Sequence, residues 1–170
     1  MKNKTKILIT GATGNVGKAL RACLSKDNYA ISCLTNENKR FADDIIGDLN
    51  NYSSLLNATK NIDIVIHLAA VIKGNKKLIN KVNVQGTKNL INACEKNKVK
   101  KIIFMSSLDI KFNTPYGISK RKAEEIIENS KLKYVILRPT AIYGEGFKTG
   151  INSLAKLMKK TPIFPIPGSG

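Results

Sequence analysis

The stretch Lys6-Ile7-Leu8-Ile9-Thr10-Gly11-Ala12-Thr13-Gly14-Asn15-Val16-Gly17 decides the fold of this chain. It runs from a short apolar strand, through a turn with glycines three residues apart, into the start of a helix. A dinucleotide diphosphate must approach such a turn closely, and a side chain larger than hydrogen would block it. The helix that begins there directs unpaired N–H groups and its positive dipole end at the phosphates. We therefore expect pyrophosphate binding at Gly11, Thr13, Gly14, Asn15, Val16 and Gly17; tight packing of helix on strand is the alternative explanation of the spacing.

Length and composition are those of one globular domain. The 170 residues are 42% hydrophobic, which is enough for a substantial core. The longest apolar stretches, such as 62–72, are too short to cross a bilayer, and no signal-peptide core follows the basic N-terminus. We expect a cytoplasmic protein without a membrane partner. The three cysteines lack metal-ligand spacing, so we expect buried, reduced thiols and no metal site.

The formal net charge of +17 raises the question of a nucleic-acid partner. Nearly all the cations are lysines, and they are spread over most of the expected helices and loops rather than gathered on one element. This pattern argues against a dedicated nucleic-acid site. A positive surface would still attract a phosphorylated small-molecule substrate and raise its encounter rate.

Strand-like and helix-like segments alternate along the chain with short connections. Such alternation predicts an α/β fold of the Rossmann type, a doubly wound parallel sheet of about six strands with helices on both faces. The expected strands are 6–10, 30–35, 44–47, 62–68, 101–105 and 134–137, and the expected helices run to about 24 and over 53–59, 76–96, 115–129 and 151–160.

A second pattern places a tyrosine and a lysine on one face of a helix. Thr114-Pro115 predicts the helix start, because threonine is a good cap and proline fits the first helical position. Tyr116 then falls in the first turn, and Lys120 lies four residues further on the same face. An ammonium lowers the pKa of a nearby phenol, so this pair would serve as a proton-transfer device. The same spacing also arises by chance on surface helices.

Polar residues follow the third and fifth expected strands. Asp48 would accept a hydrogen bond from an adenine amino group, or it is a solvated turn residue. Ser106 and Ser107 end the fifth strand, at the carboxyl edge where ligands of open α/β sheets bind. A hydroxyl there would hydrogen-bond a substrate carbonyl or alcohol, although serines in this position are more often turn or cap residues.

In this order, the motifs resemble the short-chain dehydrogenase/reductase superfamily, specifically its extended branch of NAD(P)-dependent nucleotide-sugar epimerases and dehydratases. Any one motif is weak, whereas the ordered set is specific and runs from residue 10 to residue 144. The matching stretches are Thr10–Gly17, Gly47-Asp48-Leu49, Val65-Ile66-His67-Leu68-Ala69-Ala70, Asn83-Val84-Gln85-Gly86-Thr87, Met105-Ser106-Ser107, Tyr116-Gly117-Ile118-Ser119-Lys120 and Leu137–Gly144.

The resemblance implies roles for the matching positions. Tyr116 would be the acid/base that removes or returns a hydroxyl proton, Lys120 would hold the nicotinamide ribose and lower the tyrosine pKa, and Ser107 would polarise the reacting oxygen. Asn83 would organise the site. Asp48 and Leu49 would flank adenine. The remaining implied contacts with the cofactor are Asn36, Leu68, Ala69, Ala70 and Pro139. The family also pairs through the helices near 76–96 and 115–129, which makes a homodimer the expected assembly.

Departures from the family pattern limit the expected substrate chemistry. Only eight residues separate Ser107 from Tyr116, fewer than extended members usually have, which puts the usual substrate contacts in doubt. The 4,6-dehydratases carry Thr-Asp-Glu where this chain has Ser107-Leu108-Asp109. Leu108 cannot protonate a leaving hydroxyl, so dehydration is disfavoured.

The cofactor is expected to be NAD or NADP, with NADP slightly favoured. NAD-selective members usually carry an acidic residue at the end of the second strand. Here Thr35-Asn36 ends that strand, Glu37 follows, and Lys39-Arg40 comes close behind. A cation there would pair with the 2′-phosphate of NADP, or it is part of the lysine-rich surface.

Extended members continue well beyond the position of Pro167-Gly168-Ser169-Gly170. Residues 1–170 are therefore expected to be the NAD(P)-binding domain, truncated before the substrate domain. The leading expectation is an epimerase that acts on a nucleotide-sugar by transient hydride transfer. The alternatives are an NADPH-dependent ketone or aldehyde reductase and a catalytically silent dinucleotide-binding or sensor module.

Overall fold

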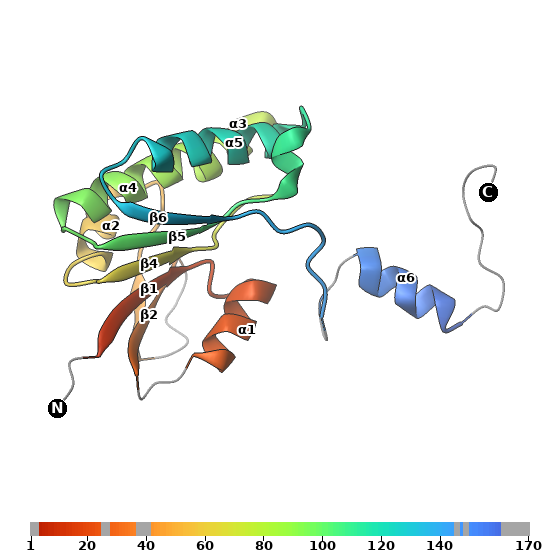
Figure 1. Cartoon of the computed structure of the whole chain (residues 1–170), viewed down its shortest axis with the longest axis horizontal. Helices are drawn as coiled ribbons and strands as arrows, with labels where there is room; N and C mark the ends of the chain where they lie inside the picture. The colour runs from red at the N-terminus through yellow and green to blue at the C-terminus, as the bar shows by residue number, and fades with distance from the viewer. Residues whose placement is uncertain (1–3, 25–27, 37–41, 145–146, 148–149, 161–170) are drawn as a thin grey trace. The chain divides into compact units, whose positions relative to one another are not determined.

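The computed structural model describes residues 4–24, 28–36, 42–144, 147 and 150–160. The chain forms two compact units, Met1–Arg138 and Pro139–Gly170. The first unit contains a sheet in the order β3-β2-β1-β4-β5-β6, in which all neighbouring strands are parallel (Figure 1). The strands are β1 Thr5–Thr10, β2 Tyr29–Thr35, β3 Asp44–Ile46, β4 Ile64–His67, β5 Lys101–Met105 and β6 Lys133–Leu137.

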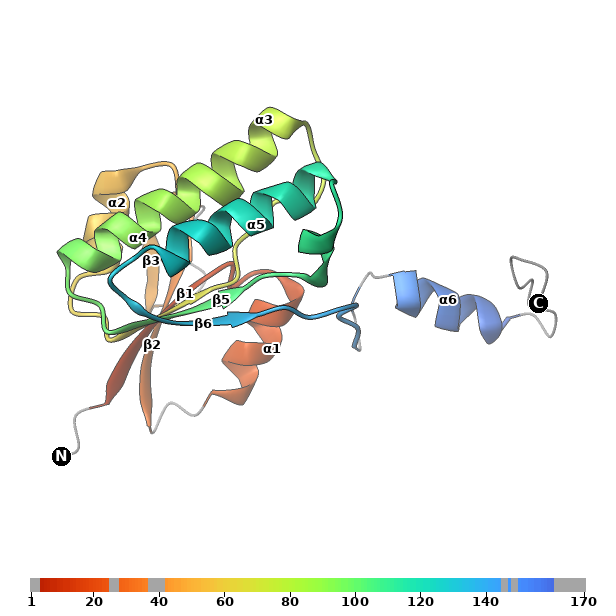
Figure 2. The ribbon, with the colours of Figure 1, turned by 45° about the horizontal axis from the view of Figure 1, so that its top comes forward.

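Helices cover both faces of this sheet. One face carries α1, and α2, α3, α4 and α5 lie on the other, with α4 and α5 side by side (Figures 1 and 2). The predicted doubly wound parallel sheet of about six strands is therefore confirmed. The helices are α1 Asn15–Cys23, α2 Tyr52–Ala58, α3 Lys76–Ile79, α4 Gly86–Lys96 and α5 Pro115–Glu128.

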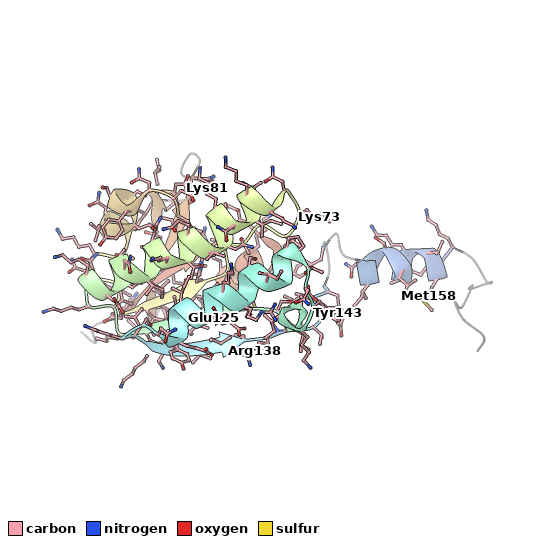
Figure 3. All side chains as sticks on the ribbon, turned by 90° about the horizontal axis from the view of Figure 1, so that it is seen from above. Lys73, Lys81, Glu125, Arg138, Tyr143 and Met158 are labelled. Atoms are coloured by element: carbon pink, nitrogen blue, oxygen red, sulfur yellow. The ribbon has the colours of Figure 1, made fainter. Side chains whose placement is uncertain are left out.

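Alternation along the strands gives each face its own apolar core. Leu8 of β1 points into the larger cluster, where Leu90 of α4 and Phe104 of β5 are at most 1% exposed. Ile7 and Ile9 point to the opposite face and pack in the smaller cluster beneath α1. Most charged side chains lie outside these cores, as Lys81 and Glu125 do on the outer surface of the helical layer (Figure 3), whereas Asp44, Lys120 and Glu124 are buried.

The strand order places a crevice at the carboxyl ends of the central strands. The chain moves outward from β1 to β2 and β3, then returns to the other side of β1 with β4. Thr10, the last residue of β1, pairs in register with Leu34 of β2 and His67 of β4. Crossovers that leave in opposite directions open a ligand crevice at such a reversal, and the glycine turn follows β1 at this point.

The helix predicted over 76–96 has the expected extent but is not uniform. Between α3 and α4 the segment Asn80–Gln85 is a π-helix, a wider turn that is frequent at functional sites. Ile79, Leu90 and Cys94 of this segment are buried. The expectation of buried thiols is correct for Cys33 and Cys94 but wrong for Cys23, which is exposed in the last turn of α1. The other predicted elements agree with the structure within two residues, whereas the 3₁₀ turn Leu108–Lys111 was not predicted.

The second unit contains the helix α6, Gly150–Met158. Asn152 ties its first turn to the preceding segment, because its Nδ2 donates to the carbonyl oxygens of Gly144, at 2.6 Å, and Phe147, at 2.8 Å. Residues 167–170 lie outside the described part of the chain. Within the described residues, no helix is long and apolar enough to span a membrane.

Candidate active site

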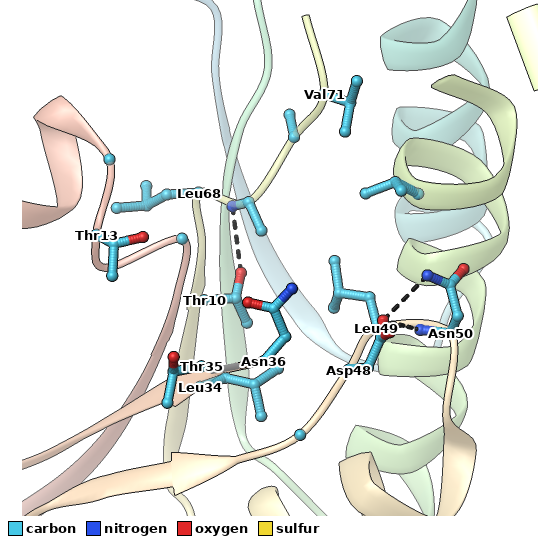
Figure 4. A pocket seen from close by; sticks show the side chains of 16 residues that line it. Thr10, Thr13, Leu34, Thr35, Asn36, Asp48, Leu49, Asn50, Leu68 and Val71 are labelled. Atoms are coloured by element: carbon cyan, nitrogen blue, oxygen red, sulfur yellow. Dashed lines mark hydrogen bonds between the residues drawn. The ribbon is translucent and has the colours of Figure 1, made fainter. Parts of the chain in front are cut away.

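A cavity of about 410 Å³ lies where the glycine turn leaves β1 (Figure 4). Its volume falls within the range of small-molecule and cofactor sites, about 300–1,000 Å³. Nine of the residues predicted to contact a cofactor line it: Gly11, Thr13, Gly14, Asn36, Asp48, Leu49, Leu68, Ala69 and Ala70. The sequence analysis did not assign the other lining residues to the site, which are Thr10, Leu34, Thr35, Gly47, Asn50, Val71 and Val82.

The glycine turn has the backbone that a closely approaching diphosphate requires. Gly11 has φ of +72°, and a Cβ built on it would lie 2.6 Å from the backbone nitrogen of Ala69. A larger residue would therefore fill the cavity wall and strain the turn. Gly14 caps α1 without a side-chain hydrogen bond, and the first turn of α1, which holds Asn15, Val16 and Gly17, contains no acidic residue. These features fit an anionic group at the start of α1.

The opposite end of the cavity contains a hydrogen-bonded acidic turn. Oδ1 of Asp48 accepts from the backbone nitrogen of Asn50, at 2.8 Å, and from its Nδ2, at 3.0 Å (Figure 4). Oδ1 of Asn50 is buried and has no hydrogen-bond partner among the residues that the structure describes. A buried acceptor without a donor is costly unless a ligand supplies one. Together with the Asp48 carboxylate, it fits a ligand that carries an amino group, as adenine does.

The 3₁₀ turn that Ser107 caps packs against the start of α5, where Tyr116 lies. The Thr114 hydroxyl accepts from the backbone nitrogen of Gly117 at 3.0 Å, which caps α5 as predicted and places Tyr116 in its first turn. Ser107 caps the 3₁₀ turn in the same way, since its Oγ accepts from the nitrogen of Asp109 at 3.1 Å. A Cβ on Gly117 would collide with the Asp109 carbonyl oxygen, so glycine lets the two turns pack directly.

Lys120 lies in the protein interior, one turn after Tyr116. The residue is 2% exposed, and its Nζ lies 4.0 Å from the centre of the Phe104 ring. Burial lowers the pKa of Lys120 to about 7, although the charge of Glu124 opposes the shift. Near neutral pH this amine therefore exists in both protonation states.

Glu124 lies a further turn along α5 and is held by Arg138 at the end of the first unit. Arg138 donates from Nε to Oε1 at 3.0 Å and from Nη2 to Oε2 at 2.8 Å. Burial acts to raise the pKa of Glu124, but the hydrogen bonds to Arg138 and the charges of Arg138 and Lys120 lower it overall. The carboxylate thus remains charged beside Lys120.

The expected lowering of the Tyr116 pKa by Lys120 is wrong for the chain without a ligand. The pKa of Tyr116 is raised, first because the side chain is partly buried and second because of the nearby charge of Asp109. Burial also lowers the pKa of Lys120, so part of the lysine is uncharged near neutral pH. It therefore stabilises a phenolate less than the fully charged ammonium assumed from the helical spacing would. Helical spacing alone does not report this desolvation.

Asn83 lies in the π-helix and is 3% exposed. Its side chain accepts from the nitrogen of Val71 at 2.8 Å and donates to the carbonyl oxygen of Val71 and to Oγ of Ser119, both at 2.9 Å. It thus joins the segment after β4 to α5 and does not line the cavity. Pro139 belongs to the second unit, and Glu37, Lys39 and Arg40 lie outside the described residues, so the predictions for these four positions stay predictions.

The sequence analysis missed several buried polar side chains that surround the site. They are His67 at the end of β4, Thr87 at the start of α4, and Glu124, which pairs with the half-exposed Arg138. The signal for His67 was a lone polar residue at the end of an apolar strand. Within the described part of the chain, no group of three His, Cys, Asp or Glu side chains could hold a metal ion.

Residues 7–161 match the family model described as the NAD dependent epimerase/dehydratase family. The Rossmann-type sheet with its glycine turn defines the class of protein, and this match covers most of the chain. The chain belongs to the NAD dependent epimerase/dehydratase family, within the extended short-chain dehydrogenases/reductases.

Curated relatives and solved structures agree with this membership. The chain is 31% identical to UDP-glucose 4-epimerase of Vibrio cholerae, over 98% of this chain and 60% of the relative. It is 34% identical to N-acetyl-alpha-D-glucosaminyl-diphospho-ditrans,octacis-undecaprenol 4-epimerase of Escherichia coli O157:H7, over 88% and 53%. The Bordetella bronchiseptica enzyme WbmG in complex with NAD superposes with a TM-score of 0.82 at 25% identity, over 94% of this chain and 61% of that one. The chain thus spans about 60% or less of these proteins.

Proposed function

We propose that this chain forms the dinucleotide-binding and catalytic part of an NAD(P)-dependent epimerase that acts on a nucleotide-sugar by transient hydride transfer. The observation that carries the proposal is the capped start of α5, which holds Tyr116 beside the Ser107 turn with Lys120 buried one turn behind. Membership of the family and the names of the two epimerase relatives support the reaction and the substrate class.

Each residue of this set has a distinct task in the proposed reaction. The bound dinucleotide supplies the hydride acceptor and, in the return step, the donor. The Tyr116 hydroxyl removes the proton of a sugar hydroxyl and later returns it, as a general base and acid. Oγ of Ser107 donates a hydrogen bond to the reacting oxygen. Lys120, with its pKa near 7, holds the ribose and supplies positive charge next to the tyrosine.

We further propose that Gly11, Gly14 and the first turn of α1 hold the diphosphate, and that Asp48 and Asn50 hold adenine. WbmG supports NAD as the ligand, because its solved structures contain NAD in one case and NAD with UDP in another. The choice between NAD and NADP is made by measurement. Calorimetric titration with both dinucleotides makes that measurement. Absence of binding to either would overturn the proposed function.

Residues 1–170 constitute the cofactor-binding domain in this proposal. Dehydration is not the proposed reaction, because Leu108 lacks the acid that would protonate a leaving hydroxyl. A homodimer through α4 and α5 is also proposed, since the two helices form one continuous outer layer that a second copy would meet (Figure 2).

The deciding experiment measures conversion of UDP-sugars by the chain with the dinucleotide but without added reductant. The Tyr116→Phe variant should lose activity by about 10²-fold or more, because it cannot exchange the proton, while its dinucleotide Kd stays unchanged. Tyr134→Phe is the matched control, since Tyr134 lies at the other end of the fold on β6 and is exposed. Stoichiometric loss of NADPH on carbonyl compounds would instead identify a reductase. Binding without any turnover would identify a dinucleotide-binding module.

A further inference from the structure

His67 is the single histidine of the chain and lies between two hydroxyl groups. It is 1% exposed at the end of β4 and stacks on Phe104, with ring centres 5.4 Å apart. Its Nδ1 lies 2.6 Å from Oγ1 of Thr10, and its Nε2 lies 3.0 Å from Oγ1 of Thr87. Thr10 lines the cofactor cavity, whereas Thr87 lies on the far side of the ring in α4.

The bonds of Thr87 determine which ring nitrogen carries the proton. The Thr87 hydroxyl donates its only hydrogen to the carbonyl oxygen of Asn83, at 2.6 Å, so it must accept from Nε2 of His67. Burial lowers the pKa of His67 to about 3, with a smaller effect from the charge of Lys120, so the ring is neutral at physiological pH. Nδ1 of a neutral ring with Nε2–H is an acceptor, and the Thr10 hydroxyl therefore donates to it.

The result is a chain of hydrogen bonds with one direction. Oγ1 of Thr10 is left to accept, and it accepts from the backbone nitrogen of Ala69 at 3.3 Å (Figure 4). The chain thus begins at the cavity wall, at Ala69, and ends at the Asn83 carbonyl in the π-helix. Each hydroxyl along it donates one hydrogen bond and accepts one, and each ring nitrogen makes one hydrogen bond. A buried polar network in which every group has a partner specifies one conformation.

From Asn83 the hydrogen bonds continue into α5, which holds Tyr116. The Asn83 amide donates to Oγ of Ser119, and the Ser119 hydroxyl donates to the carbonyl oxygen of Tyr116 at 2.7 Å. Ser119 is 3% exposed, so water does not compete for these bonds. A buried network therefore joins the wall of the cofactor cavity to the backbone of Tyr116.

We infer that His67 is a positioning residue, whose Nε2–H tautomer couples dinucleotide binding at the glycine turn to the placement of Tyr116. This inference rests on the proposed function and adds a residue to it. Without an acceptor at Thr87, the Nδ1–H tautomer becomes the better one, and the ring then donates to Thr10. The Thr10 hydroxyl must turn its hydrogen to another acceptor, which alters the cavity wall. Histidine suits the position because its neutral ring is a donor on one side and an acceptor on the other.

The test changes Thr87, which does not line the cavity, and measures the Kd for NAD and NADP. Thr87→Val should weaken binding about fivefold, the lower end of typical coupling between sites, and Thr87→Ser should restore it. Thr59→Val is the matched control. Thr59 is also fully buried, and its hydroxyl also donates to the carbonyl oxygen four residues earlier, that of Leu55, at 2.8 Å. Thr59, however, lies at the end of α2 and accepts from Asn97, so it is not part of the His67 network. An unchanged Kd in Thr87→Val, or equal weakening in Thr59→Val, would overturn the inference.

A second measurement stands apart from dinucleotide binding. With ¹⁵N-labelled histidine, the single imidazole of the chain should give the Nε2–H pattern, and Thr87→Val should shift it and the amide signals of Ser119 and Tyr116. Thr59→Val should leave all three in place. An Nδ1–H pattern in the unaltered chain, or unmoved amide signals in Thr87→Val, would refute the network even if NAD binds. If neither dinucleotide binds while these shifts occur, the proposed function and its coupling to His67 fail, and only the hydrogen-bond network between His67 and α5 stands.

Discussion

Replacing Lys120 by methionine removes the buried ammonium and keeps most of the side-chain volume. Lys120 is 2% exposed, and burial lowers its pKa from 10.5 to about 7. A buried lysine with a lowered pKa destabilises the folded chain at any pH at which the unfolded chain carries the lysine's charge, because the charge must be buried or the proton released on folding. The Lys120→Met variant should therefore be more stable than the unaltered chain at neutral pH, while it loses the proposed catalytic function.

The sign and size of the effect follow from proton binding. Between pH 7 and pH 10.5 the unfolded chain keeps the lysine proton and the folded chain has released it, so the unfolded state binds more protons and stability rises with pH. A difference of one proton changes the free energy of unfolding by about 1.4 kcal/mol per pH unit. From pH 7 to pH 9 the gain is about 2 kcal/mol, since the folded lysine is still half protonated at pH 7.

Urea unfolding of the two chains at pH 7, 8 and 9 measures this gain directly. The free energy of unfolding should rise with pH in the unaltered chain relative to Lys120→Met. The exposed Lys122 on the same helix provides the control Lys122→Met, which should keep the rise. Burial raises the pKa of Cys33 to about 11 and of Cys94 to about 12, but both thiols are common to all three chains and cancel. Parallel pH profiles for Lys120→Met and the unaltered chain would refute the reasoning.

Two further substitutions test the cavity and the pair behind Lys120. Gly11→Ala should weaken NAD or NADP binding at least about tenfold, because the new Cβ would lie 2.6 Å from the backbone nitrogen of Ala69 and the residue has φ of +72°. Circular dichroism checks that the variant folds. An unchanged Kd would contradict the assignment of the turn. Glu124→Gln should lower the free energy of unfolding by about 1–2 kcal/mol, less than a fully buried pair because Arg138 is half exposed. Because the charge of Glu124 raises the pKa of Lys120, the substitution should also move the rise in the free energy of unfolding to lower pH. Urea unfolding over the same pH range measures this shift, and a rise at unchanged pH would exclude it.

Local features of the sequence predicted the sheet, the glycine turn and the start of α5. These features act over a few residues: the period of apolar side chains, the need for hydrogen at Gly11, and the Thr114 cap with Pro115 at the first helical position. Such constraints are readable because each is satisfied by neighbours in the chain. Nine of the predicted cofactor residues accordingly meet in one cavity.

The tertiary structure alone decided the electrostatics of the site. Tyr116 and Lys120 have the spacing of a proton-transfer pair, but their pKa values depend on how deeply α5 packs against Phe104 and the 3₁₀ turn. The hydrogen bonds of His67 join residues 57 and 20 positions apart, which no local pattern records. Desolvation and buried hydrogen bonds depend on what folding brings together from distant parts of the chain. The sequence by itself therefore predicted which residues line the cavity of the proposed dinucleotide site, and only the folded chain determined how the groups around it are charged and oriented.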